Sequence, residues 1–120
     1  MKFNALRPIL WTEQLEETIQ FYCTILDFHI GEQNADWGWA SLYKDDVEIM
    51  LSLPNKHEGF DKPKFTGSFY FNVENVEEVW SKIKDKTNIC YPIEIFEWGM
   101  REFAIYDNNG YILQFGQEIE

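Results

Sequence analysis

The two halves of this 120-residue chain repeat one pattern, and the repeat constrains the fold more than any other feature. Asp36-Trp37-Gly38 returns as Glu97-Trp98-Gly99, which places Trp98 61 residues after Trp37. In each half an acidic amphipathic stretch precedes this tripeptide, and two short apolar runs joined by a polar turn follow it. Two copies are too few to stack as a solenoid, so we expect two strand–helix–hairpin units that pair around a shared site.

The first unit is expected over about residues 1–53, as one strand, one helix and three further strands. Thr12 is the expected N-cap of the helix, because a hydroxyl there can accept an unpaired backbone N–H. Apolar residues at helical spacing carry the helix to about Asp27. The strands are expected at about 5–11, 28–32, 37–43 and 47–52. The polar stretch 54–66 is the expected linker.

The second unit is expected over residues 67–120. Asn75 and Glu78 form a capping-box pattern at the start of a helix that ends near 85–86. Asn109-Gly110 suits the positive φ angles of a tight hairpin turn. The strands are expected at 67–73, 92–96, 101–106 and 111–116. The chain is therefore predicted to be a single α+β domain of two repeats, long enough to bury a core.

The net charge of −11 and a sequence pI near 4.5 make nucleic acid an improbable class of partner, because phosphate binding requires the opposite sign. The acidity has two interpretations: it keeps the protein soluble, or it gathers cationic ligands. Aromatic residues are 18% of the chain and include five Trp. They serve either as core or as surfaces for flat aromatic ligands.

Two cysteines, Cys23 and Cys90, are too few for a disulfide scaffold, and Cys23 is expected to be a reduced core thiol on the first helix. The amino-terminal residues lack the apolar stretch of a signal peptide, and no run approaches transmembrane length. The expected location is cytoplasmic, with no membrane partner.

The sequence resembles the vicinal oxygen chelate superfamily, which includes glyoxalase I, extradiol dioxygenases and bleomycin resistance proteins. The resemblance covers nearly the whole chain and is most specific at 15–22, 26–28 and 106–115. Residues 98–104 are similar to a Trp-Gly-Arg-Glu-Phe stretch of bleomycin resistance proteins, with Met100 inserted. The resemblance implies two βαβββ modules whose curved mixed sheets surround a cavity, and a homodimer.

Metal-dependent members of this superfamily carry His, Glu or Gln at four ligand positions. The resemblance places Arg7, Met50, Ser68 and Gln114 there. Arginine has no lone pair to offer, and a methionine sulfur is too soft for hard or borderline divalent ions. The two histidines fall elsewhere: His29 is expected on a strand surface and His57 in the linker. We therefore expect no metal and no other cofactor.

No catalytic set replaces the metal. Glu102 could serve as a base, but a salt bridge or hydrogen bond is the commoner role of such a residue. The resemblance and the two-residue period of strands imply instead a ligand-binding face formed by Trp37, Trp39, Met50, Ser52, Tyr70, Trp98, Glu102 and Gln114. For Trp37 and Trp98, a core or dimer role is the alternative.

Three functions stay open. The first is a binding protein that sequesters a planar, cationic antibiotic of the bleomycin type, as a resistance factor would. The second is a lyase, isomerase or dioxygenase of the same superfamily with an atypical site. The third is a member whose cavity is vestigial or holds an unknown metabolite. The residues favour binding over catalysis.

Overall fold

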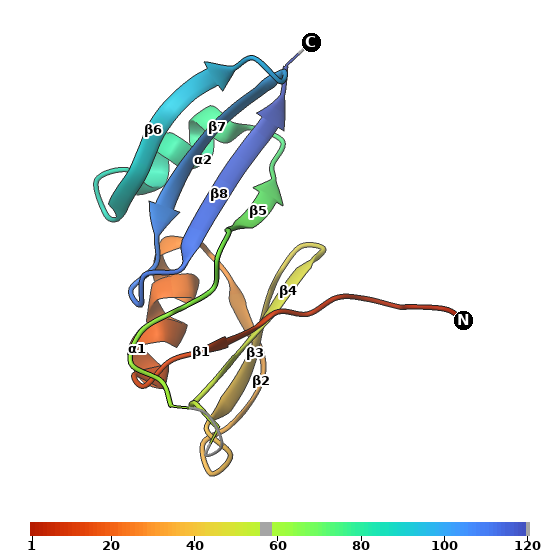
Figure 1. Cartoon of the computed structure of the whole chain (residues 1–120), viewed down its shortest axis with the longest axis vertical. Helices are drawn as coiled ribbons and strands as arrows, with labels where there is room; N and C mark the ends of the chain where they lie inside the picture. The colour runs from red at the N-terminus through yellow and green to blue at the C-terminus, as the bar shows by residue number, and fades with distance from the viewer. Residues whose placement is uncertain (56–58, 120) are drawn as a thin grey trace. The chain divides into compact units, whose positions relative to one another are not determined.

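The computed structural model describes residues 1–55 and 59–119. The chain forms two compact units, Met1–Asp61 and Lys62–Glu120, and each contains one four-stranded mixed sheet (Figure 1). The division falls inside the stretch expected as the linker, and His57 lies outside the described residues. The predicted α+β fold with two βαβββ units is confirmed.

The elements of the first unit are β1 (Ile9–Trp11), α1 (Leu15–Gln20), the π-helical turn η1 (Phe21–Ile25), β2 (His29–Asn34), β3 (Trp39–Lys44) and β4 (Val47–Ser52). The strand order is β1-β4-β3-β2, with β1 parallel to β4 and the other pairs antiparallel. Strand alternation buries Leu42 and Leu51 on the side of α1. Trp39 and Met50 therefore lie on the opposite, helix-free face.

The elements of the second unit are β5 (Phe69–Asn72), α2 (Val76–Ile83), β6 (Asn88–Phe96), β7 (Met100–Tyr106) and β8 (Ile112–Glu118). The strand order β5-β8-β7-β6 repeats that of the first unit. Phe103 of β7 contacts Trp80 of α2 and Phe115 of β8, with ring centroids 5.0 and 5.1 Å away. Because alternate residues share a face, the even-numbered residues of β7 and β8 lie on the helix-free face.

The repeated Trp-Gly tripeptides close the same turn in both units. Gly38 donates its backbone N–H to Ala35 and accepts that of Leu53, at 3.2 and 2.8 Å. Gly99 repeats this with Phe96 and Ile119, at 3.1 and 3.0 Å. Both glycines have positive φ, +63° and +83°, which a residue with a Cβ rarely adopts. Since the turn and strand registers match, residues of the two units can be paired by position.

The start of the first helix differs from the expectation. The N-cap is Gln14 and not Thr12, because the Thr12 hydroxyl accepts the Gln14 backbone N–H at 3.0 Å, one step before the helix begins. The Thr12 side chain is fully buried and bonds to the Thr18 hydroxyl at 2.9 Å. The helical path expected to reach about Asp27 widens after Gln20 into η1 and ends at Ile25.

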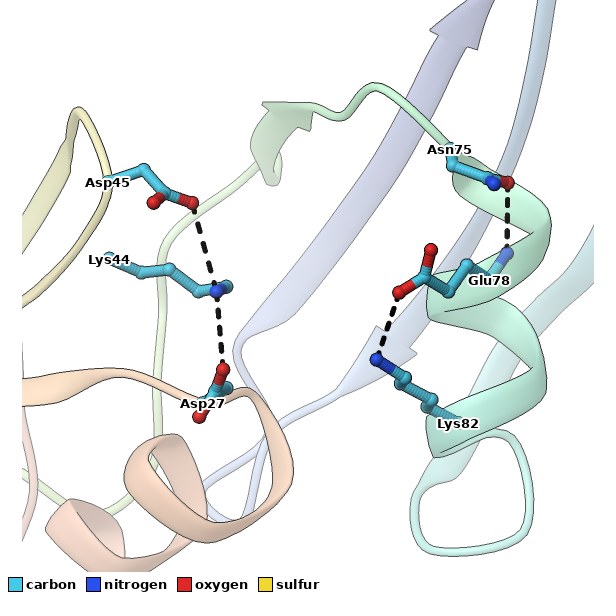
Figure 2. Close-up of polar contacts among 6 residues, drawn as sticks. All are labelled: Asp27, Lys44, Asp45, Asn75, Glu78 and Lys82. Atoms are coloured by element: carbon cyan, nitrogen blue, oxygen red, sulfur yellow. Dashed lines mark hydrogen bonds and ion pairs between the residues drawn. The ribbon is translucent and has the colours of Figure 1, made fainter.

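The cap of the second helix is confirmed in part. The Asn75 Oδ1 accepts the Glu78 backbone N–H at 3.2 Å, as the capping box predicts (Figure 2). The Glu78 carboxylate does not reach back, because it pairs with Lys82 at 2.9 Å. In the first unit, Lys44 lies between Asp27 and Asp45, at 3.4 and 3.7 Å (Figure 2).

The strand expected at 92–96 begins earlier, at Asn88, and includes Pro92. Its pairing with β7 shifts register between Tyr91 and Glu94, which is where a proline without an N–H can be accommodated. Cys23 and Cys90 are both free and half-buried. Among the described residues, no helix is long and apolar enough to cross a membrane.

Candidate functional site

The helix-free face of the second sheet gathers one buried carboxylate and four hydrogen-bond donors. Glu102, in the middle of β7, is only 1% exposed. Its Oε1 accepts the indole N–H of Trp98 at 2.9 Å and the hydroxyl of Tyr70 at 3.2 Å. Its Oε2 accepts the hydroxyl of Tyr91 at 2.5 Å and the amide N–H of Gln114 at 2.8 Å. We call these five residues the Glu102 cluster.

The donors come from four parts of the unit. Tyr70 lies on β5, Tyr91 on β6, Trp98 in the turn before β7 and Gln114 on β8. Gln114 also donates to the Tyr91 oxygen at 2.6 Å, and its amide oxygen accepts the Ser68 hydroxyl. A carboxylate only accepts hydrogen bonds, so the Gln114 amide must turn its nitrogen inward and its oxygen toward Ser68. All four surrounding side chains therefore donate to Glu102, and the carboxylate accepts from each of them.

Within the described part of the chain, the Glu102 carboxylate has no cationic side chain as a partner. The neighbouring Arg101 faces α2, where it pairs with Glu77. Burial raises the pKa of Glu102, but the hydrogen bonds from Tyr91, Trp98, Gln114 and Tyr70 outweigh burial, so its pKa is lowered. The group is anionic at neutral pH.

The tyrosine hydroxyls of the cluster remain protonated for the complementary reason. Burial, the Glu102 charge and the hydrogen bond to Glu102 raise the pKa of Tyr70 to about 12. The pKa of Tyr91 is raised as well, by burial first and then by its hydrogen bond to Glu102. Both phenols therefore act as donors to the carboxylate across the neutral range.

Two aromatic rings of the cluster are open to solvent. Trp98 is 61% exposed and Tyr70 is 40% exposed. The Trp98 ring stacks on Phe96 with centroids 4.7 Å apart and an interplanar angle of 12°. Tyr91 meets the same Phe96 edge-on at 5.6 Å. The Trp98 indole is thus fixed by Phe96 and by Glu102, although most of its surface faces solvent.

The structure brings together four of the eight predicted ligand-binding residues, Tyr70, Trp98, Glu102 and Gln114. The other four lie in the first unit. The Trp39 indole N–H points to the Met50 sulfur at 3.3 Å, and Trp39 pairs with Ser52 across β3 and β4. Trp37 is 75% exposed, and its backbone N–H donates to the Asn34 side chain.

In the first unit, different side chains occupy the positions equivalent to Glu102, Tyr70 and Gln114. By the shared turn and strand registers, Ser41 occupies the position of Glu102, and its oxygen accepts the Glu32 backbone N–H at 3.0 Å. Arg7 and Glu48 correspond to Tyr70 and Gln114, and they form an ion pair at 2.7 Å. The same backbone frame therefore presents two different chemistries.

The donor set does not fit a divalent metal ion. Of the four positions expected from the resemblance, Arg7 is a cation already paired with Glu48, and Met50 receives the Trp39 N–H. The strand registers correct the other assignments, because they place Tyr70, not Ser68, at the position equivalent to Arg7 in the repeat, and Glu48, not Met50, at the position of Gln114. Gln114 turns its nitrogen toward Glu102, and its oxygen is taken by Ser68. Within residues 1–55 and 59–119 there is no group of three His, Cys, Asp or Glu side chains that could hold a metal. His29 lies on the β2 surface against the Tyr43 ring.

Sequence reasoning did not single out Tyr91 or Phe96 as site residues. Both lie on β6, and Tyr91 precedes the residue at which that strand was expected to begin. A proline is normally found at the first residue of a strand, at an edge or at a bulge, so the strand was expected to begin at Pro92. In the structure β6 begins at Asn88 and continues through Pro92 at a register shift. An aromatic residue directly before such a proline was the available signal.

Comparison with known proteins identifies the family. Residues 4–115 match the model of the Glyoxalase/Bleomycin resistance protein/Dioxygenase superfamily. The chain therefore belongs to this superfamily, as the sequence resemblance predicted. No curated protein sequence matches the chain.

Several solved structures share the fold. A protein of unknown function from Agrobacterium tumefaciens is 16% identical with a TM-score of 0.83, and the match covers 99% of this chain and 97% of that one. A superfamily member from Sphaerobacter thermophilus is 19% identical with a TM-score of 0.80, covering 96% and 98%. A lactoylglutathione lyase from Agrobacterium tumefaciens is 12% identical with a TM-score of 0.73, covering 97% and 94%. At these identities the likeness shows the fold alone.

Proposed function

We propose that this chain is a metal-independent binding protein that holds a planar, cationic small molecule against the helix-free face of the second sheet. The single observation that carries the proposal is the buried Glu102 carboxylate, which is anionic and has no cation among the described residues. A ligand that brings a positive charge to this face would complement it. The net charge of −11 favours the approach of such a ligand over longer range.

The exposed aromatic rings beside Glu102 would contribute stacking surface for the ligand. Trp98 and Tyr70 present aromatic surface to solvent at the edge of the Glu102 cluster. Aromatic stacking contributes roughly 0.5–1.5 kcal/mol per pair beyond simple burial. A planar ring system with a positive charge would satisfy both the rings and the carboxylate. Antibiotics of the bleomycin type combine these features, and they are the first ligands to test.

Catalysis by Glu102 is the weaker alternative. A general base needs a free lone pair and a pKa near the working pH. The Glu102 oxygens already accept four hydrogen bonds, and the pKa is lowered. Both properties oppose proton abstraction, so the geometry supports binding better than lyase or isomerase chemistry.

The test is a titration of bleomycin followed by intrinsic Trp fluorescence, with a thermal-shift screen of other planar cations. Replacing an aromatic anchor by Ala commonly costs about 2 kcal/mol or more, so Trp98→Ala should weaken binding at least about thirtyfold. Ile95→Ala is the control, because Ile95 is an exposed apolar residue of the same sheet on the opposite side, where its partner Arg101 faces α2. If Trp98→Ala binds as tightly as the wild type, the ligand lies elsewhere.

A further inference from the structure

We infer that the preferred ligand of this face is an aromatic cation without N–H donors, such as an N-alkylated heteroaromatic ring or an aryl quaternary ammonium. The inference rests on the proposed function and narrows its ligand class. It follows from how the protein itself uses the carboxylate of Glu102.

The protein fills every acceptor position of the carboxylate with its own donors. Each oxygen of Glu102 accepts two hydrogen bonds, from Trp98 and Tyr70 on Oε1 and from Tyr91 and Gln114 on Oε2. A carboxylate offers about four such positions. At 1% exposure, the side chain also leaves almost no surface for a ligand to touch. A ligand N–H therefore finds neither a free lone pair nor direct access at Glu102.

The charge of Glu102 reaches the surface through the two exposed rings. Both donors to Oε1 are polar groups of rings that face solvent, the Trp98 indole and the Tyr70 phenol. Hydrogen bonds to an anion polarise the donor, because electron density shifts from the N–H or O–H toward the ring. Cations bind to the electron-rich faces of such rings, and Trp gives the strongest interaction. The buried carboxylate thus makes its two surface rings better platforms for a cation.

This arrangement discriminates between kinds of cation. A primary ammonium is strongly hydrated and gives up hydrogen bonds to water when it binds to the face of a ring. Here the carboxylate cannot replace those bonds, so the cost of desolvation remains. A quaternary or N-alkylated cation has no such bonds to lose. The negative charge of Glu102 favours a cation, and its four occupied acceptor positions favour a cation that has no N–H group to donate.

The experiment compares matched probes by isothermal titration calorimetry on the full chain. The first pair is (2-naphthylmethyl)trimethylammonium and (2-naphthylmethyl)ammonium, which share the ring and the charge and differ in N–H groups. The second pair is N-methylquinolinium and neutral quinoline, which differ in charge. We expect the quaternary compound to bind at least about tenfold more tightly than the primary ammonium, and N-methylquinolinium at least about tenfold more tightly than quinoline.

Variants locate the effect. Glu102→Gln removes the charge, and Tyr70→Phe removes one donor but keeps the ring. Both should reduce the preference for the quaternary compound severalfold, whereas Ile95→Ala, an exposed residue on the α2 side of the same sheet, should not. The indole N–H resonance of Trp98 in the NMR spectrum should move upfield in Glu102→Gln, which reports the lost bond to an anion independently of binding.

The outcomes separate the two claims. If the primary ammonium binds as tightly as its trimethyl counterpart and Trp98→Ala weakens both, the inferred ligand class is wrong while the proposed binding face stands. If none of the probes binds, or if Trp98→Ala changes nothing, the proposed face itself is wrong and this inference falls with it. A preference that survives Glu102→Gln unchanged would show that the carboxylate has no part in the selection.

Discussion

The Tyr70 ring lies directly over Gly116. A Cβ atom on Gly116 would be 1.9 Å from the Tyr70 hydroxyl oxygen and 2.6 Å from the carbon that bears it. Gly116 is also the residue of β8 that pairs with Glu102 of β7. The missing side chain therefore leaves the space through which Tyr70 reaches the carboxylate.

Gly116→Ala should displace Tyr70 and break its hydrogen bond to Glu102. Leaving a buried acceptor short of one donor costs about 1–3 kcal/mol, so the free energy of unfolding in urea should fall by about that amount. Gly59→Ala is the control, because no atom of the described residues lies within 4 Å of a Cβ built at Gly59. In a Tyr70→Ala background Gly116→Ala should cost much less, and an undiminished cost there would refute the steric explanation.

Acid should destabilise the protein through Glu102. Its pKa is lowered from the ordinary 4.5 in the folded state, so its contribution to stability is present above 4.5 and is lost as the pH falls through the lower folded value. Urea unfolding measured from pH 7 down to about pH 3 should show this loss in the wild type. Glu102→Gln should flatten that part of the curve, whereas the exposed Glu78→Gln should alter it less. Equal slopes for wild type and Glu102→Gln would contradict the lowered pKa.

Alkali should act through Tyr70. Its pKa is raised from 10.0 to about 12 in the folded state, so the stability it contributes is fully present below pH 10 and is lost as the pH rises to about 12. A spectrophotometric titration of the folded protein should show a phenol that ionises near 12 and is missing in Tyr70→Phe. If Tyr70→Phe instead removes a phenol that ionises near 10, the hydrogen bond to Glu102 is absent in solution.

Purified protein should contain no stoichiometric Zn, Ni, Fe or Mn. The reason is the donor set: the Arg7 guanidinium offers no lone pair, and the Gln114 amide is committed to Glu102 and Ser68. Elemental analysis and a melting temperature unchanged by a chelator would agree with this expectation. One ion per chain that is lost in Gln114→Ala would contradict it.

We also expect the chain to form a homodimer. Phe3, Leu6 and Ile9 are exposed at the amino-terminal end of the first unit, where β1 is an edge strand (Figure 1). An exposed apolar segment beside an open strand edge favours association with a second copy. Sedimentation equilibrium should therefore give twice 14.4 kDa at micromolar concentration. A monomer at that concentration would rule this out, and Phe3→Ser with Leu6→Ser should weaken the dimer.

The sequence predicted the fold well because the repeat constrains it twice. Each Trp-Gly tripeptide indicates the same turn, so the order of strands and helix expected in one half can be checked against the other half. The candidate site was less predictable. The resemblance placed Tyr70, Glu102 and Gln114 in one predicted binding face, but it did not give the direction of their hydrogen bonds. Tyr91 was missed because β6 runs through Pro92, and the pairing of Arg7 with Glu48 depends on a register that spans 41 residues.

The opposite charges of Arg101 and Glu102 have a consequence for folding as well. They are adjacent on β7 and point to opposite sides of the sheet, one toward Glu77 of α2 and the other toward the tyrosine hydroxyls. A slip of β7 by one residue would exchange the two sides. A slip in one direction would bring Glu102 to the place of Arg101, beside the like charge of Glu77, and a slip in the other direction would bring Arg101 to the place of Glu102, among side chains that donate to a carboxylate. The alternation that places Glu102 on the helix-free face thus also disfavours the misaligned hairpin.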